Sequence, residues 1–182
     1  LYHLPFTKLL NESKIILGSS NIHFRFGHTS LIQYSNAFNF NILFKEKGIL
    51  IPQGLLIVSI IYYFGTKIFQ YNKKKIKLNF IFLFFCFSFS ILNYNRYSSF
   101  GNDAGANLLF LLLIYKAFNL AKKEISTDDI FLLSFISLFC FAQKSFFILS
   151  FVIPFLILIY FQKKNLFLII KSKKTLILFS LI

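Results

Sequence analysis

The chain has 182 residues, of which 57% are hydrophobic and 20% aromatic, and its mean hydropathy is +0.68. Several apolar runs approach the roughly 20 residues that a helix needs to cross a bilayer core of about 30 Å. The net charge of +14 does not indicate nucleic-acid binding, because the lysines gather in short loops between these runs. We therefore predict an all-α fold, a polytopic transmembrane helix bundle.

The two ends of the sequence suggest a piece of a longer protein. It begins with Leu1, contains no Met, and stops inside the apolar run 175–182. No basic segment followed by an apolar stretch marks a signal peptide at its start. We expect an internal fragment, and the predictions concern that fragment.

Residues 1–48 are mixed in polarity and are predicted to form a loop that contains short amphipathic helices. Pro5 is a favourable first-turn residue for a helix that runs to about Ser13. In a second helix, Leu31, Tyr34 and Phe38 recur at helical spacing while polar residues occupy the other positions. This pattern is typical of a helix that lies on a membrane surface.

Residues 49–182 are predicted to form the transmembrane helix bundle. The 32-residue run 130–161 is interrupted by Gln143-Lys144-Ser145 and has basic loops on both sides, so we interpret it as two short spans with a turn between them. The predicted spans are about 49–69, 76–92, 104–121, 130–142, 146–161 and the truncated 175–182.

The lysines predict the orientation of the bundle through the positive-inside rule. Of the 20 basic residues, 13 lie in alternate loops or at the span ends beside them. These are Lys67, Lys73, Lys74, Lys75, Lys77, Lys116, Lys122, Lys123, Lys163, Lys164, Lys171, Lys173 and Lys174. The rule places residues 1–48, 93–103 and 143–145 on the outer side of a bacterial cytoplasmic membrane.

Several polar residues fall on this outer side. Arg25 and Arg96 are the only arginines beside 18 lysines, and the planar guanidinium binds phosphate or carboxylate through two parallel hydrogen bonds. His3, His23 and His28 lie on the same side. Either a functional cluster or chance sorting of a few polar loop residues explains this distribution.

Asp103 and Lys144 each have two interpretations. Asp103 follows Asn102 at the start of a predicted span, where a carboxylate caps the helix or belongs to a site. Lys144 interrupts an apolar run, where it either extends its ammonium to the outer headgroups or contacts a phosphate.

The sequence offers weak evidence for metal binding. His23 and His28 are five residues apart, which is not the i, i+4 spacing of a helical pair, and no carboxylate lies near them in sequence. Cys86 and Cys140 lie inside apolar runs and are expected to behave as small buried hydrophobic residues. We predict no metal ligands.

Three short stretches together resemble those of a protein superfamily: Leu1-Tyr-His-Leu-Pro5, Ser20-Asn-Ile-His-Phe-Arg-Phe-Gly27, and Gly101-Asn-Asp103 before a span. They are similar to bacterial members of the GT-C type membrane glycosyltransferases, which use polyprenyl- or dolichyl-phosphate-linked sugars. The likeness covers most of the chain, through motifs that are short.

The resemblance implies a layout for the site. In that superfamily a long outer loop starts with a catalytic acidic residue, a second acidic residue commonly opens the fourth span, and a lysine often lies between the fifth and sixth. Asp103 and Lys144 match the second acidic residue and the lysine. The first acidic residue would precede Leu1, and Glu12 does not match its position.

The resemblance therefore implies an enzyme that moves a sugar from a lipid-phosphate donor to an acceptor on the outer face of the membrane. Asp103 is the expected catalytic residue, and the expected substrate contacts are Arg96, Arg25, Lys144, His3, His23 and Asn102. A divalent cation is a candidate cofactor, and the partners are the bilayer and the lipid-linked donor. The alternatives are a transporter or flippase of a lipid-linked or anionic solute, and a non-catalytic membrane scaffold.

Overall fold

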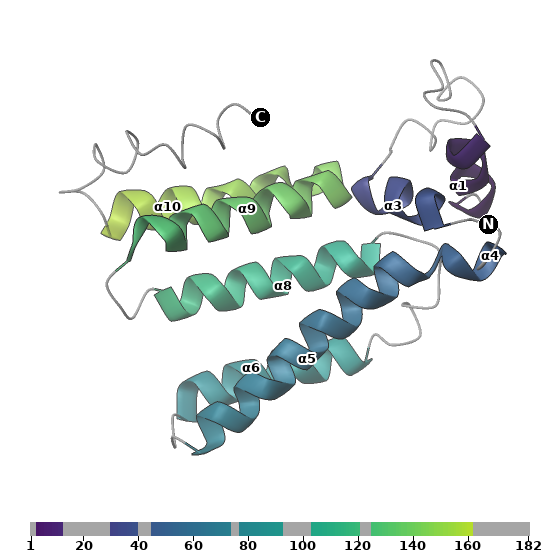
Figure 1. The fold of residues 1–182 in the computed structure, drawn as a ribbon. Helices are drawn as coiled ribbons and strands as arrows, with labels where there is room; N and C mark the ends of the chain where they lie inside the picture. The colour runs from purple at the N-terminus through teal and green to yellow at the C-terminus, as the bar shows by residue number, and fades with distance from the viewer. Residues whose placement is uncertain are drawn as a thin grey trace.

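The computed structural model describes residues 3–12, 30–39, 45–73, 77–92, 103–120 and 125–161. These residues are almost entirely helical and include no strand, which confirms the predicted all-α class for this part of the chain. Figure 1 shows the helices. Their bounds are α1 His3–Glu12, α3 Leu31–Asn39, α4 Lys45–Gly48, α5 Ile51–Lys73, α6 Lys77–Leu92, α8 Asp103–Leu120, α9 Thr127–Gln143, the 3₁₀ helix η2 Ser145–Phe151, and α10 Val152–Phe161.

The longer helices run back and forth between two ends of a bundle (Figure 1). Helices α5 and α6 pack as one pair, α9 packs against η2 and α10, and α8 contacts both groups. Helices α1, α3 and α4 gather at the end where α5 and α8 begin and α9 stops. The described parts of the segments that were predicted to lie on one side of a membrane therefore meet at one end of the bundle.

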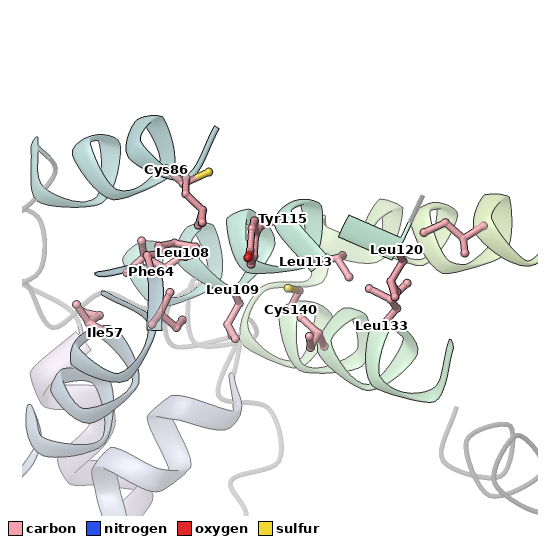
Figure 2. Packing of buried hydrophobic residues seen from close by; sticks show 14 residues of the cluster. Ile57, Phe64, Cys86, Leu108, Leu109, Leu113, Tyr115, Leu120, Leu133 and Cys140 are labelled. Carbon is pink, nitrogen blue, oxygen red and sulfur yellow. The ribbon is translucent and has the colours of Figure 1, made fainter. Parts of the chain in front are cut away.

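Helix α8 supplies the centre of the hydrophobic core. Leu108, Leu113 and Tyr115 are almost fully buried and lie between residues of α5 and α6 and residues of α9 (Figure 2). The Tyr115 ring meets the Phe64 ring of α5 edge to face, with 6.0 Å between the ring centroids. Cys86 and Cys140 are buried in this core as free thiols, as expected from the sequence.

Small residues bring α8 close to α5 near Asp103. Ala104, Gly105 and Ala106 are all buried in the first turn of α8. A Cβ atom at Gly105 would lie 3.2 Å from the Leu56 side chain of α5. Because small residues let helix backbones approach closely, this sequence sets the position of the first turn of α8.

The hairpin between α9 and η2 is held by polar contacts. Lys144 has an extended backbone and stands between the two helices, at the interruption noted in the sequence. Ser137 Oγ donates to the Ser150 carbonyl and Ser150 Oγ donates to the Ser137 carbonyl, each over 3.1 Å. Pro154 has no N–H to offer the Ser150 carbonyl, and the Ser137 hydroxyl lies within hydrogen-bond distance of both that carbonyl and the Leu133 carbonyl of its own helix.

The described helices expose much apolar surface. Side chains of α6, η2 and α10 such as Phe85, Leu92, Phe146 and Phe155 are more than half exposed. Two helices, Ile51–Asn72 and Asp103–Leu120, are long and apolar enough to cross a membrane, and Leu78–Leu92 and Ser145–Ile159 are shorter apolar helices. Exposed apolar area on this scale marks a surface that faces lipid or another protein.

Helix α3 turns its polar side inward. Gln33 and Asn36 are buried, whereas Leu31, Tyr34 and Phe38 are exposed, Phe38 by 84%. The Asn36 amide, oriented to satisfy its neighbours, donates to the Ile49 carbonyl over 2.9 Å. The apolar side that the sequence analysis assigned to a membrane surface thus faces away from the bundle.

We predict that Leu113→Ala lowers the free energy of unfolding by about 2 kcal/mol, because it leaves a cavity in the core around α8. Unfolding of the purified protein in mixed detergent, followed by circular dichroism, measures the change. Leu55→Ala is the matched control: its side chain is 64% exposed, so we expect a change below about 0.5 kcal/mol. Equal effects of the two substitutions would contradict the packing described here.

Candidate functional site

An ion pair links two residues that the sequence analysis singled out separately. Lys144 Nζ lies 2.8 Å from Asp103 Oδ1, and 41 positions separate the two residues in sequence. The Lys144 side chain is 43% exposed and the Asp103 side chain 66% exposed. Both charged groups are therefore accessible to a ligand that approaches this end of the bundle.

Helix ends position the two groups. Asp103 is the first residue of α8, where the positive end of the helix dipole favours a carboxylate. Lys144 follows the last residue of α9, and its N–H donates to the Cys140 carbonyl as the C-cap. The negative end of the α9 dipole favours its ammonium. The packing of α8 against α9 then brings the two helix ends together.

The ion pair contributes little to stability. Pairs between exposed side chains are typically worth 0–1 kcal/mol, because water screens the charges and both side chains lose freedom. A contribution of this size does not explain the choice of Lys at the interruption of an apolar run. The geometry is compatible with a structural role, but it also leaves a carboxylate and an ammonium side by side for substrate.

Buried polar side chains surround the base of this end of the bundle. Six of them form a set that we call the polar layer: Thr7, Ser30, Gln33, Asn36, Gln53 and Gln143, each no more than 2% exposed. They come from α1, α3, α5, α9 and the residue before α3. Gln33 Oε1 accepts from the Ser30 N–H over 2.9 Å, which caps the start of α3.

Sequence reasoning missed the polar layer. It placed Gln33 and Asn36 at the polar positions of an amphipathic helix, treated Gln143 only as part of a turn, and did not consider Gln53. The available signal was polar residues inside or beside apolar runs, which in membrane proteins usually face the interior. Their burial at the end that carries Asp103 and Lys144 makes this end polar on the inside as well as at its surface.

Most of the other predicted contacts lie outside the described residues. These are Arg25, Arg96, His23 and Asn102, together with His28 of the metal hypothesis. His3 begins α1, but its side chain is not among those described. The structure therefore brings together two of the predicted site residues, Asp103 and Lys144.

The donor set of the described residues does not fit a divalent cation. Within the described ranges, no three His, Cys, Asp or Glu side chains gather as a metal site would require. Asp103 instead has the Lys144 ammonium as its partner. We therefore derive no chemical step through a metal ion.

Comparison with known proteins gives a family and no function. No curated protein and no solved structure matches the chain. The family model described as Domain of unknown function (DUF8201) matches residues 1–182. Because this match spans the whole printed sequence, the chain belongs to the DUF8201 family.

Proposed function

We propose that this chain is part of a polytopic membrane glycosyltransferase that moves a sugar from a lipid-phosphate donor to an acceptor on the outer face of a bacterial cytoplasmic membrane. The observation that carries the proposal is the accessible Asp103–Lys144 pair at the polar end of an otherwise apolar bundle. The resemblance to GT-C type enzymes, at the same two residues, supports the choice of chemistry.

The dimensions of the helices support a bundle that crosses a membrane. At 1.5 Å per residue, the 18 residues of α8 span about 27 Å and the 17 residues of α9 about 25 Å, close to the thickness of a bilayer core. In this arrangement the polar layer and the Asp103–Lys144 pair lie near one interface. The apolar side of α3 then faces the lipid at the same level.

The proposed reaction uses the two charges at separate points. The bond between the sugar and the phosphate oxygen breaks, its electron pair stays on the phosphate, and the acceptor oxygen bonds to the sugar carbon. Lys144 stabilises the negative charge on the departing lipid phosphate. Asp103 accepts a hydrogen bond from the acceptor hydroxyl, and its carboxylate is the candidate among the described residues for taking the proton.

The pair has a consequence for substrate binding. In the described arrangement each charge neutralises the other, so a donor phosphate competes with Asp103 for the Lys144 ammonium. Once the ammonium contacts phosphate, the carboxylate is released toward the acceptor. A lipid-linked donor reaches this end of the bundle along the exposed apolar surfaces of α9 and α10. Such a donor carries no nucleotide, so the reaction needs no nucleotide-binding element.

We predict that Asp103→Asn and Lys144→Gln each lower sugar transfer by about 100-fold or more in membranes that contain the full-length protein. Transfer of radiolabelled sugar from a polyprenyl-phosphate donor is the measurement. Asp128→Asn is the matched control, because Asp128 is an exposed carboxylate in the first turn of α9 at the opposite end. It should leave transfer within about two-fold of the wild type.

The exchanged pair Asp103→Lys with Lys144→Asp separates catalysis from structure. It can restore an ion pair, so a purely structural role predicts normal transfer once the protein is folded. The proposed chemistry predicts that transfer stays lost while the protein remains inserted in the membrane. Normal transfer in the exchanged variant, or in both single variants, would rule out this site.

A second prediction concerns orientation. A membrane-impermeant maleimide should label Lys47→Cys in intact bacterial cells, but should label Thr127→Cys only after the membrane is opened. Both positions are exposed and lie at opposite ends of the bundle, whereas Cys86 and Cys140 are buried and serve as the unlabelled background. Labelling of Thr127→Cys from outside would reverse the proposed orientation, and labelling of both would contradict the membrane-spanning bundle.

A further inference from the structure

A pocket opens at the end of the bundle opposite to Asp103 and Lys144. It has a volume of about 390 Å³ and lies where α5 and α8 end and where α6 and α9 begin. Its polar lining includes Lys67, Lys116, Tyr71, Asn79, Asn119 and Asp129. By the positive-inside rule this end faces the cytoplasm, since most lysines of the sequence lie in or beside its loops.

Hydrogen bonds from three helices hold the inner wall of the pocket. Asn119 Oδ1 accepts from Asn79 Nδ2 over 2.9 Å and from the Tyr71 hydroxyl over 3.2 Å. Asn119 Nδ2 donates to the Tyr115 carbonyl over 3.0 Å, and the Tyr115 hydroxyl donates to the Tyr71 hydroxyl over 3.3 Å. Because Asn79 and Tyr115 are buried, this network forms a fixed polar surface at the base of the pocket.

Two ammonium groups lie around one aromatic ring of the pocket. Lys116 Nζ is 4.7 Å from the centre of the Tyr63 ring, and Lys67 Nζ is 5.7 Å from the same centre. Lys67 Nζ also donates to Gln70 Oε1 over 2.9 Å. Within the described residues neither ammonium forms an ion pair with a carboxylate. The two positive charges line the same pocket, and an anion bound there would lower their mutual repulsion.

The carboxylate in the described lining, Asp129, caps the start of α9. Asp129 Oδ2 accepts from the Ser126 N–H over 3.1 Å and from the Ser126 hydroxyl over 2.8 Å, and completes the capping box of α9. The formal charge of the described lining is therefore +1, from two lysines and one aspartate. This charge suits an oxyanion with one negative charge.

We propose that this pocket binds a phosphodiester monoanion, as carried by the headgroup of an anionic membrane lipid. The phosphate lies between Lys67 and Lys116, and the hydroxyl and amide groups of Tyr71 and Asn119 contact the polar remainder of the headgroup. Leu120 and Leu132, which also line the pocket, face the start of the acyl chains. The inference rests on the proposed membrane embedding, and it is independent of sugar transfer.

Calorimetric titration of the full-length protein in a neutral detergent tests the proposal. The probes are dihexanoyl phosphatidylglycerol, which carries one negative charge, dihexanoyl phosphatidylcholine, which has no net charge, and inorganic phosphate. We expect phosphatidylglycerol to bind at least about ten-fold more tightly than phosphatidylcholine. Inorganic phosphate that binds as tightly as phosphatidylglycerol would identify free phosphate as the ligand and overturn the assignment to a lipid headgroup.

Two double variants and one control assign the binding to the pocket. Lys67→Gln with Lys116→Gln should weaken phosphatidylglycerol binding by about ten-fold or more, because both ammonium groups that attract the anionic headgroup are removed. Lys67→Arg with Lys116→Arg keeps both charges and should stay within about three-fold of the wild type. Lys47→Gln removes an exposed lysine at the opposite end and should bind like the wild type.

Two further outcomes overturn the proposal: equal binding of phosphatidylglycerol and phosphatidylcholine, or unchanged phosphatidylglycerol binding in the Lys67→Gln, Lys116→Gln variant. Sugar transfer is measured on the same preparations. Loss of headgroup selectivity with transfer intact would refute the pocket alone. Selective binding in a protein that shows no transfer would refute the proposed enzyme and leave the pocket standing.

Discussion

The packing of α8 between two helical pairs is the constraint on which the rest of the structure depends. Its buried residues meet α5 and α6 on one side and α9 on the other, through Leu108, Leu113 and Tyr115. In the proposed membrane setting, lipid would not drive apolar helices together as water does, and this contact would rely on close fit and a few hydrogen bonds between helices. The fit of the aromatic rings around Tyr115 provides much of that contact.

Because α8 joins both groups of helices, it also connects the two polar regions of the molecule. Asp103 opens the helix beside Lys144, and Asn119 closes it within the network that lines the opposite pocket. The first turn, with Ala104, Gly105 and Ala106, lets α5 approach closely. The last turn instead presents an amide to its neighbours. One helix thus fixes the places of a candidate reaction site and a candidate headgroup site.

The distribution of polar groups supports the proposed membrane bundle, because polar residues gather at its two ends and apolar surface lies between them. The polar layer is buried at one end, and the lysines and tyrosines of the pocket lie at the other. Between them, the exposed surface of α6 and α10 is largely apolar. Helix α3, at the end that carries Asp103, has the same distribution: Gln33 and Asn36 are buried against the bundle and Phe38 is exposed.

The sequence alone indicated the helical class, because its apolar runs are continuous and several approach the length of a helix that crosses a membrane. It also indicated the interruption at Lys144 and singled out Asp103 as a candidate site residue, since few charges lie at the edges of apolar runs. The roles of these residues in sugar transfer came from a resemblance and remain a prediction. Arg25, Arg96, His23 and Asn102 lie outside the described residues.

Only the tertiary structure decided which polar residues meet. Asp103 and Lys144 are 41 positions apart, and their pairing follows from the packing of α8 on α9, which local sequence patterns do not encode. The same holds for Asn79, Tyr71 and Asn119, each of which lies on a different helix. Helical periodicity predicts which residues share a face, but the rotation and pairing of helices are set by side-chain fit across the whole bundle.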